Sequence, residues 1–162
     1  MHASPEGAQK EVAMTSGVFD VMIDAPVERV WPWIADLGKH AEWSPKDYSV
    51  EWIEGEPNAV GSRFRSVGWV PGDNHRVNEG EILENRPQER FALRAHDKDG
   101  SYADTFTLEP QGQRTKVTFR LDFVKLNGMA ALMVPVVFPL IGKKDIRNRM
   151  GLLKARVEAS QP

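Results

Sequence analysis

The sequence contains no cysteine, which excludes a disulfide framework, a zinc site built on thiolates and a cysteine nucleophile. The same absence fits a reducing compartment, so we expect a cytoplasmic protein. An excess of basic charge is also missing, because the formal net charge is −2 and both signs are mixed along the chain. This composition argues against nucleic-acid binding, which needs an electropositive surface.

Long apolar runs are missing as well. The longest, between Gly128 and Gly142, is shorter than the roughly 20 residues of a membrane-spanning helix, and it contains Pro135 and Pro139, which kink or break helices. We expect this segment to be a buried or half-buried helix of a soluble protein. The alternative is a helix that lies on a membrane surface, and stable membrane insertion is not expected.

The first residues of the chain, 1–14, are polar and lack the apolar core of a secretion signal. We expect a disordered tail there. The remaining length, 15–160, suits one domain with a single hydrophobic core, because a chain of this size buries enough surface to fold without disulfides or metals.

Motifs that mark common enzyme classes are absent too. The sequence has no Gly-rich phosphate loop, no His-Glu-x-x-His and no Gly-x-Ser-x-Gly. Its four histidines lie far apart, without metal-ligand spacing; they are His2, His40, His75 and His96. We therefore expect neither a metal site nor a cofactor. Whether the protein is an enzyme stays open, and we favour a non-enzymatic role.

The sequence does show a change from helical to alternating periodicity. A strand is predicted at 16–23, a helix with one apolar face at 26–37, and a short turn or helix at 39–43. Pro26 suits the first helical position and Gly38 a C-cap. Period-two alternation then predicts strands at 48–54, 62–70, 76–84, 90–96, 102–109 and 116–124. The short, turn-rich breaks between them imply antiparallel neighbours.

The chain closes with a predicted helix from Gly128 to about Ala159. Its first half is apolar on nearly all sides, whereas its second half carries one apolar stripe formed by Ile146, Met150, Leu153 and Val157. The order of elements predicts an α+β helix-grip fold. In this fold a seven-stranded curved antiparallel sheet wraps round the long C-terminal helix, and two short helices follow the first strand.

Several short motifs occur in the order and spacing of one known superfamily. Its first-helix signature is similar to Ala25-Pro26-x-Glu28-x-Val30-Trp31 with Asp36 after it, and its second short helix to Trp43-Ser44-Pro45. Its later strands and turns are similar to Gly61-Ser62-Arg63-Phe64, to Glu81-Ile82 through Arg86-Pro87, and to Leu108-Glu109-Pro110 with Gly112 and 115–118. The chain resembles the START-like or Bet v 1-like (SRPBCC) superfamily, especially its bacterial polyketide cyclase/dehydrase and lipid-transport branch.

This resemblance covers nearly all of 15–160 and implies a ligand tunnel between the sheet and the C-terminal helix. It does not imply one chemistry, because the fold hosts carriers, cyclases, hormone receptors and co-chaperones.

Strand alternation indicates which side chains face the predicted tunnel, although each of them can equally fill an ordinary core. Met129 and Met133 are adaptable liners, and we expect tryptophans near the entrance. Phe64 and Trp69 fall on opposite faces unless Gly68 marks a bulge, and the sequence leaves this open. The residues expected to contact a ligand are Trp43, Phe64, Trp69, Leu93, Tyr102, Phe106, Phe119, Met129, Met133 and Val137.

Asp104 is the most interesting polar candidate, because the alternation that puts Phe106 and Leu108 inside also puts this carboxylate inside. Desolvation raises the pKa of such a group, which suits a general acid or base. Glu81 and Tyr102 are further catalytic candidates. The ordinary alternatives are an Asp104 that reaches solvent or an arginine, a Glu81 on an outer face, and a Tyr102 used for packing.

Three functions therefore remain in view. The leading one is binding or transport of a small hydrophobic ligand such as a lipid or polyketide, with the segment 129–140 as a candidate lid. The second is a polyketide aromatase/cyclase-type enzyme. The third is a co-chaperone-like protein-interaction module, which would present an exposed apolar patch. Surplus apolar surface near 134–140 also allows a homodimer.

Overall fold

Strand β1 (Thr15–Ile23) forms one edge of a seven-stranded antiparallel sheet, and β2 (Ser49–Glu54) forms the other. From β1 the order continues through β7 (Arg114–Leu126), β6 (Gly100–Gln111), β5 (Arg90–Asp97), β4 (Asp73–Arg86) and β3 (Arg63–Val70). The computed structural model describes residues 15–160. The disordered tail predicted at 1–14 lies outside the described residues.

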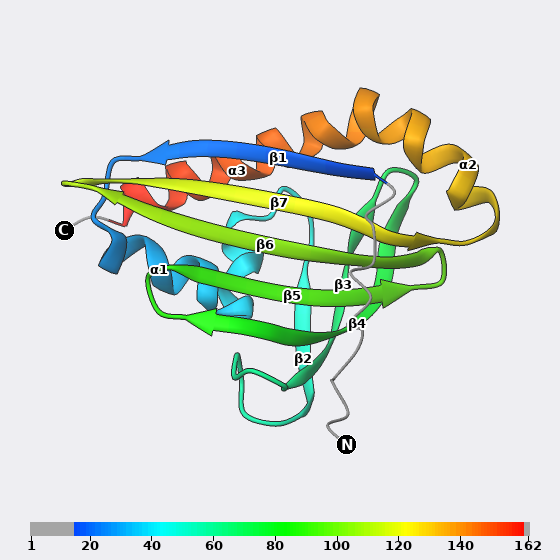
Figure 1. The fold of residues 1–162 in the computed structure, drawn as a ribbon, viewed down its shortest axis with the longest axis horizontal. Helices are drawn as coiled ribbons and strands as arrows, with labels where there is room; N and C mark the ends of the chain where they lie inside the picture. Colours follow the sequence, from blue (N-terminus) through cyan, green and yellow to red (C-terminus); the bar gives the residue numbers. More distant parts are fainter. Residues whose placement is uncertain (1–14, 161–162) are drawn as a thin grey trace, which may run out of the picture.

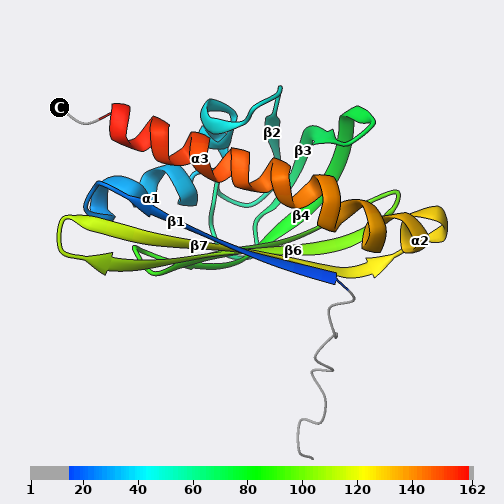
Figure 2. The same ribbon diagram turned by 90° about the horizontal axis from the view of Figure 1, so that it is seen from above.

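Two short helices follow β1, namely α1 (Val27–Ala35) and the 3₁₀-helix η1 (Leu37–Trp43). The C-terminal helix consists of three pieces, α2 (Gly128–Val137), a π-helical turn η2 (Phe138–Gly142) and α3 (Lys143–Ala159). The sheet curls so that β2 and β3 cross behind the long strands (Figure 1), and α3 runs along its concave side together with α1 and η1 (Figure 2). The predicted helix-grip fold is confirmed.

The core lies between α3, α1 and the concave face of the sheet. Alternate residues of the central strands point into it, and the stripe on α3 buries Met150, Leu153 and Val157 against them. At about 25 cal/mol per Å², apolar burial of this kind is the main stabilising contribution. The sheet-side members of the core include Ile23, Phe64, Ile82, Phe91, Leu93, Phe106, Val117 and Phe119.

The boundary between α1 and η1 differs from the prediction. Pro26 is the extended N-cap rather than the first helical residue, and α1 ends at Ala35, without Gly38 as its cap. Asp36 instead accepts a hydrogen bond from the Gly38 N–H at 2.9 Å, and Asn58 accepts one from the Leu37 N–H at 2.9 Å. Because Asn58 comes from the loop after β2, these bonds fix η1 against the sheet.

The predicted break at the C-terminal prolines takes the form of the π-helical turn η2. Pro139 has no N–H to donate, so the regular helical bonding pattern cannot continue through it. At this turn Phe138 is buried, and its ring packs edge-on against Phe123 with the two ring centres 5.1 Å apart. A Cβ atom on Gly142 would collide with the Phe138 ring, and one on Gly17 would lie 3.2 Å from it. Because neither glycine has a side chain, the Phe138 ring fits in the space between them.

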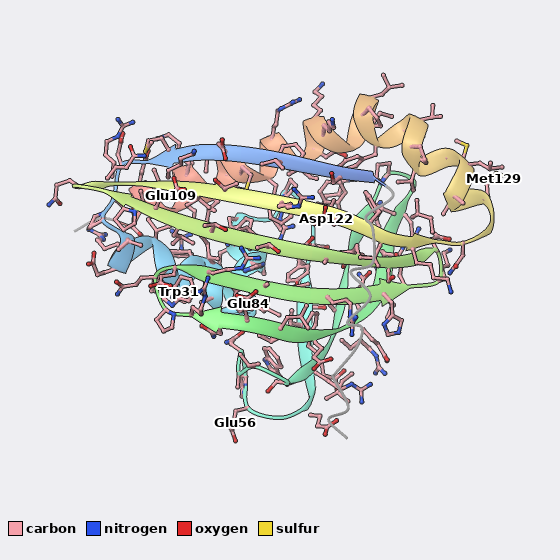
Figure 3. All side chains as sticks on the ribbon, in the orientation of Figure 1. Trp31, Glu56, Glu84, Glu109, Asp122 and Met129 are labelled. Atoms are coloured by element: carbon pink, nitrogen blue, oxygen red, sulfur yellow. The ribbon has the colours of Figure 1, made fainter. Side chains whose placement is uncertain are left out.

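Helix α2 is more exposed than a core helix: Ala130, Ala131, Val134 and Val137 are half-buried, and none of its residues is fully buried. It lies at the end of the sheet where β7 stops and β1 begins, with Met129 at its outer end (Figures 1 and 3). Met129, Leu132 and Leu140 are 70%, 70% and 73% exposed. Val134 packs against the hydrophobic core, and the side chains on the opposite side of the segment face outward. Within residues 15–160, no helix is both long enough and apolar enough to cross a bilayer.

Candidate functional site

A pocket of about 260 Å³ lies between the concave face of the sheet and the start of α3. Its wall is mainly apolar, and its polar groups come from η1, the residues before β2, strands β3 to β6, and α3. The apolar lining consists of Leu37, Phe64, Trp69, Val70, Pro71, Leu93, Phe106, Phe119, Leu121, Phe123, Phe138 and Ile146. Such a site suits a small, largely apolar molecule with a few polar groups.

A β-bulge brings both Phe64 and Trp69 to this pocket. The pairing of β3 with β4 shifts register between Gly68 and Val70, so Trp69 does not follow the alternation of the residues before it. Both side chains line the pocket. The open question about Trp69 is thus answered by the bulge that Gly68 suggested.

Asp104 lines the pocket from the middle of β6. Its in-register neighbours are Leu93 on β5 and Leu121 on β7, so neither residue directly beside it carries a side-chain hydrogen-bond donor. Its Oδ1 atom is buried and has no hydrogen-bond partner among the described residues. Burial raises the pKa of Asp104 to about 7; Arg149 opposes this shift and Asp122 adds to it. Near neutral pH the carboxyl group therefore exists in both protonation states.

His40 on η1 is held as a neutral imidazole. Its Nε2 lies 2.8 Å from the Ile34 carbonyl oxygen, which can only accept, and its Nδ1 lies 3.5 Å from Nη2 of Arg149, which can only donate. Only the tautomer protonated at Nε2 satisfies both contacts. Burial, reinforced by Arg149, lowers the pKa of His40 to about 3.

Arg149 reaches the pocket from α3. Its guanidinium group lies over the Trp43 ring, 4.6 Å from the ring centre. Asp145, one turn earlier on the helix, also lines the pocket. The ion pairs of α3 in the described chain involve Lys154 and Arg156, and none of them involves Arg149 or Asp145. The pocket thus contains a cation whose contacts are an aromatic face and a neutral imidazole.

Two tyrosines, Tyr48 and Tyr102, also contribute polar groups to the pocket. Burial raises the pKa of Tyr48 to about 12, against a lowering contribution from Arg149. Burial, with Asp104 as the next cause, also raises the pKa of Tyr102 well above its ordinary value. Both phenols therefore stay protonated at neutral pH and can donate hydrogen bonds to a ligand.

An ionic cluster contributes Arg76 and Asp97 to the pocket wall. Arg76 on β4 pairs with Asp97 at 3.2 Å, with Asp73 at 3.1 Å and with Asp99. Asp97 also accepts hydrogen bonds from the N–H groups of Asp99 and Gly100 at 2.7 and 3.1 Å, which fixes the turn between β5 and β6. The charge of Arg76 is thus balanced by three carboxylates, whereas Arg149 has no carboxylate of the described chain in an ion pair with it.

Among the residues predicted to contact a ligand, six line this pocket. They are Phe64, Trp69, Leu93, Tyr102, Phe106 and Phe119. Of the catalytic candidates, Asp104 and Tyr102 line it, and Glu81 does not. Glu81 lies on the other face of β4, in register with Arg63 and Arg94, because the residues on either side of it point inward. As a pocket residue, Glu81 was wrongly predicted.

The other predicted contacts fall outside the pocket for two reasons. Trp43 is buried in the core, where its Nε1 donates to the Trp33 carbonyl oxygen at 3.1 Å, so it supports Arg149 and His40 from behind. Met129 and Met133 are exposed on α2, and Val137 is half-buried at its end. The π-helical turn puts Phe138 at the pocket in their place.

Sequence reasoning missed His40, Tyr48 and Arg149. Arg149 directly precedes Met150 of the buried stripe on α3, so its position beside that stripe was a usable signal. Tyr48 precedes β2 and His40 lies in a 3₁₀-helix, and neither segment has a periodicity that reveals which side faces inward. Within residues 15–160, no group of three or more His, Asp or Glu side chains has an arrangement that would hold a metal ion.

The fold and the pocket between its sheet and its terminal helix define a helix-grip protein. Residues 14–158 match the family described as polyketide cyclase / dehydrase and lipid transport. The chain therefore belongs to this family, within the SRPBCC superfamily. No curated protein matches the sequence.

Several solved structures share the fold at low sequence identity. The Zhui aromatase/cyclase from Streptomyces sp. R1128 has a TM-score of 0.70 and 18% identity, covering 89% of this chain and 93% of that one. The protein TTHA0849 from Thermus thermophilus has a TM-score of 0.70 and 21% identity, and the match covers 91% of this chain and 100% of that one. CV1439 from Chromobacterium violaceum has a TM-score of 0.68 and 19% identity, covering 89% and 98%. At these identities the likeness concerns the fold.

Proposed function

We propose that the protein binds a small hydrophobic molecule, such as a lipid or a polyketide, in the pocket between its sheet and α3, and that it carries this molecule in the cytoplasm. The observation that supports this function is an apolar pocket of about 260 Å³ with polar side chains grouped around Asp104 and Arg149. Ligand sites typically have roughly 300–1,000 Å³ and the same mixture of surfaces. The small volume favours a compact ligand.

Titration with Nile red, a neutral apolar dye, tests this function. Wild-type protein should enhance the dye's fluorescence with saturation. Leu121→Trp, which fills part of the pocket, should weaken binding at least tenfold. The matched control Val77→Trp adds the same side chain at an exposed position on β4 and should leave binding unchanged. Equal binding by all three proteins would show that the dye does not enter the pocket.

A second function, cyclase/dehydrase-type catalysis, is supported by the unpartnered carboxyl group of Asp104. Its pKa of about 7 allows the ionised form to take a proton from the carbon next to a ketone. The protonated form can then return that proton to a departing hydroxyl group, which leaves as water while a carbon–carbon double bond forms. Tyr102 would donate a hydrogen bond to the ketone oxygen.

Dehydration of a β-hydroxy ketone, followed by the absorbance of the unsaturated product, tests this second function. We expect Asp104→Asn to retain Nile red binding and to lose at least a hundredfold in rate, the scale of general acid–base catalysis. Equal rates for wild type and variant, or no rate above the uncatalysed reaction, would leave ligand binding as the function.

A further inference from the structure

We infer that the pocket selects anionic amphipathic ligands, with the acidic head group on Arg149 and the apolar body among the aromatic side chains. This inference rests on the proposed binding function and names its ligand class. It begins from the observation that Arg149 forms no ion pair among the described residues, although it lies close enough to Asp104 to oppose the rise in that group's pKa. A guanidinium group beside an apolar pocket is stabilised by a carboxylate or phosphate that accepts two of its N–H groups.

The groups around Arg149 leave room for such an anion. The His40 Nδ1 contact is long at 3.5 Å, and the Trp43 ring covers one face of the guanidinium group without using its N–H groups. Tyr48 and Tyr102 stay protonated and can donate to the same head group. The carboxyl groups that line the pocket are Asp97, Asp104 and Asp145. Asp97 is paired with Arg76, and Asp104 in its protonated form can donate rather than repel.

Three probes of equal chain length test the charge preference on the wild-type protein. Decanoate, 1-decanol and decylammonium are each used to displace Nile red. We expect decanoate to bind about tenfold more tightly than 1-decanol, and decylammonium to bind most weakly, since a charge-assisted hydrogen bond is about twice as strong as a neutral one. Equal affinities would overturn the anion preference and leave the pocket intact. If the dye binds the pocket and none of the probes displaces it, the anion preference fails while the binding function stands; if the dye itself does not bind, the binding function fails.

Substitution assigns the preference to one side chain. Arg149→Met should reduce decanoate affinity to that of 1-decanol and leave 1-decanol unchanged, and Arg149→Lys should restore part of the loss. The control is Arg147→Met on the same helix, where the side chain is exposed, lies over Phe19 and does not line the pocket. A preference for decanoate that survives Arg149→Met would overturn the assignment.

A separate observation concerns the apolar surface of α2 and η2, which we call the α2–η2 face and define by Met129, Leu132, Met133, Val136, Leu140 and Ile141. All six side chains are exposed. From Met129 to Ile141 the sequence contains no polar side chain. Exposed patches of this kind mark interaction sites, and we propose that this one docks on a lipid bilayer with anionic head groups.

The charges around the α2–η2 face support this partner. Lys125 precedes it, Lys143 and Lys144 follow it, and Arg147 lies one turn further on; the acidic residue in this stretch is Asp145. In the described chain none of these four cations forms an ion pair. Cations at both ends of an apolar segment match a bilayer surface, where the chains bury apolar groups and phosphates attract the charges.

The same charges disfavour a second copy of this chain as the partner. A symmetric dimer through the α2–η2 face would pair the segments in parallel or antiparallel fashion. Both ends carry lysine, so either arrangement brings like charges together. A protein–protein interface also contains about one hydrogen bond per 100–200 Å², and the α2–η2 face has no polar side chain that could form one. The segment is too short to span a bilayer, and its length suits an interfacial position.

Cosedimentation with vesicles tests the docking. We expect wild-type protein to bind vesicles of phosphatidylcholine with about 30% phosphatidylglycerol at least tenfold more strongly than phosphatidylcholine alone. The double variant Leu132→Gln/Leu140→Gln should lose binding to both, and Lys143→Gln/Lys144→Gln should lose the preference for the anionic lipid. The control Val77→Gln changes an exposed apolar residue of β4 and should bind as wild type does.

Sedimentation velocity of the same proteins completes the test. A monomer that binds vesicles supports the docking. A dimer that dissociates on Leu132→Gln/Leu140→Gln, without vesicle binding by wild type, would overturn it in favour of a homodimer. A monomer that binds neither vesicle would overturn it as well.

Discussion

The polar side of the pocket and the α2–η2 face depart from the usual distribution of side chains in opposite directions. The pocket encloses Asp104 and His40, which elsewhere would be solvated, whereas the α2–η2 face exposes apolar side chains that elsewhere would be buried. Both regions adjoin η2, since Phe138 lines the pocket and Leu140 lies on the exposed face. Neither departure helps stability, and both accord with the proposed binding of a ligand in the pocket and of a bilayer at the α2–η2 face.

Truncation of one leucine in each half of the C-terminal helix gives the largest expected contrast. Leu153→Ala on α3 should lower the free energy of unfolding by about 2–5 kcal/mol, because it leaves a cavity in the core. Leu132→Ala on α2 should change it by less than about 0.5 kcal/mol. Urea denaturation followed by circular dichroism measures both. Comparable losses would mean that Leu132 is buried in solution and that the α2–η2 face is covered.

A pair of glycines on the same helix sharpens the comparison. Gly142→Ala should destabilise the protein by about 1–3 kcal/mol, because the new methyl group collides with Phe138, which lines the pocket. Gly151→Ala meets nothing within 4 Å and should stabilise the helix by roughly 0.5–1 kcal/mol. Thermal unfolding of both variants is the measurement. A stabilising Gly142→Ala would show that Phe138 does not occupy its inward position.

The pH dependence of stability reports on Asp104. The pKa of Asp104 rises from 3.8 to about 7 on folding. The group therefore contributes its full stabilisation below about pH 4, this stabilisation is lost as the pH rises to about 7, and none of it remains above that pH. The pKa of His40 falls from 6.5 to about 3, so its contribution is present above about pH 6.5 and is lost as the pH falls. Between about pH 4 and 6.5 the two effects oppose each other.

Asp104→Asn should therefore stabilise the protein at pH 8 by about 1–2 kcal/mol relative to wild type, with little difference at pH 4. Below pH 6.5 the variant should lose stability more steeply on acidification, because only the His40 effect remains. Denaturation curves from pH 4 to 8 measure both trends. A difference between the two proteins that is the same at every pH would show that Asp104 has an ordinary pKa.

The smallest expected effect concerns ligand affinity. Decanoate should bind roughly threefold more weakly at pH 8 than at pH 6, because ionised Asp104 repels the anion held by Arg149. His40 stays neutral over this range and the two tyrosines stay protonated, so none of these three groups produces the change. Asp122 is paired with Arg120 at 2.8 Å. Asp104→Asn should abolish the pH dependence. An unchanged dependence in the variant would place the titrating group elsewhere.

The sequence predicted the fold well because alternation and turn residues are local signals. Every strand appears, and even the bulge that turns Trp69 inward was suggested by Gly68. The site was predicted unevenly. Asp104 follows from strand parity, but Met129 and Met133 depended on where the sheet ends under α2, which periodicity does not record. Arg149 and His40 meet across more than a hundred residues of chain, a contact that only the tertiary fold brings about.

Native mass spectrometry of the purified protein tests the central proposal most directly. The account predicts a species heavier than the bare chain by the mass of one small molecule, which is released on denaturation, is apolar with an acidic group, and is absent from Leu121→Trp but retained by Val77→Trp. A bare chain alone, which also takes up neither decanoate nor Nile red when these are added, would contradict the proposal that this pocket binds a ligand.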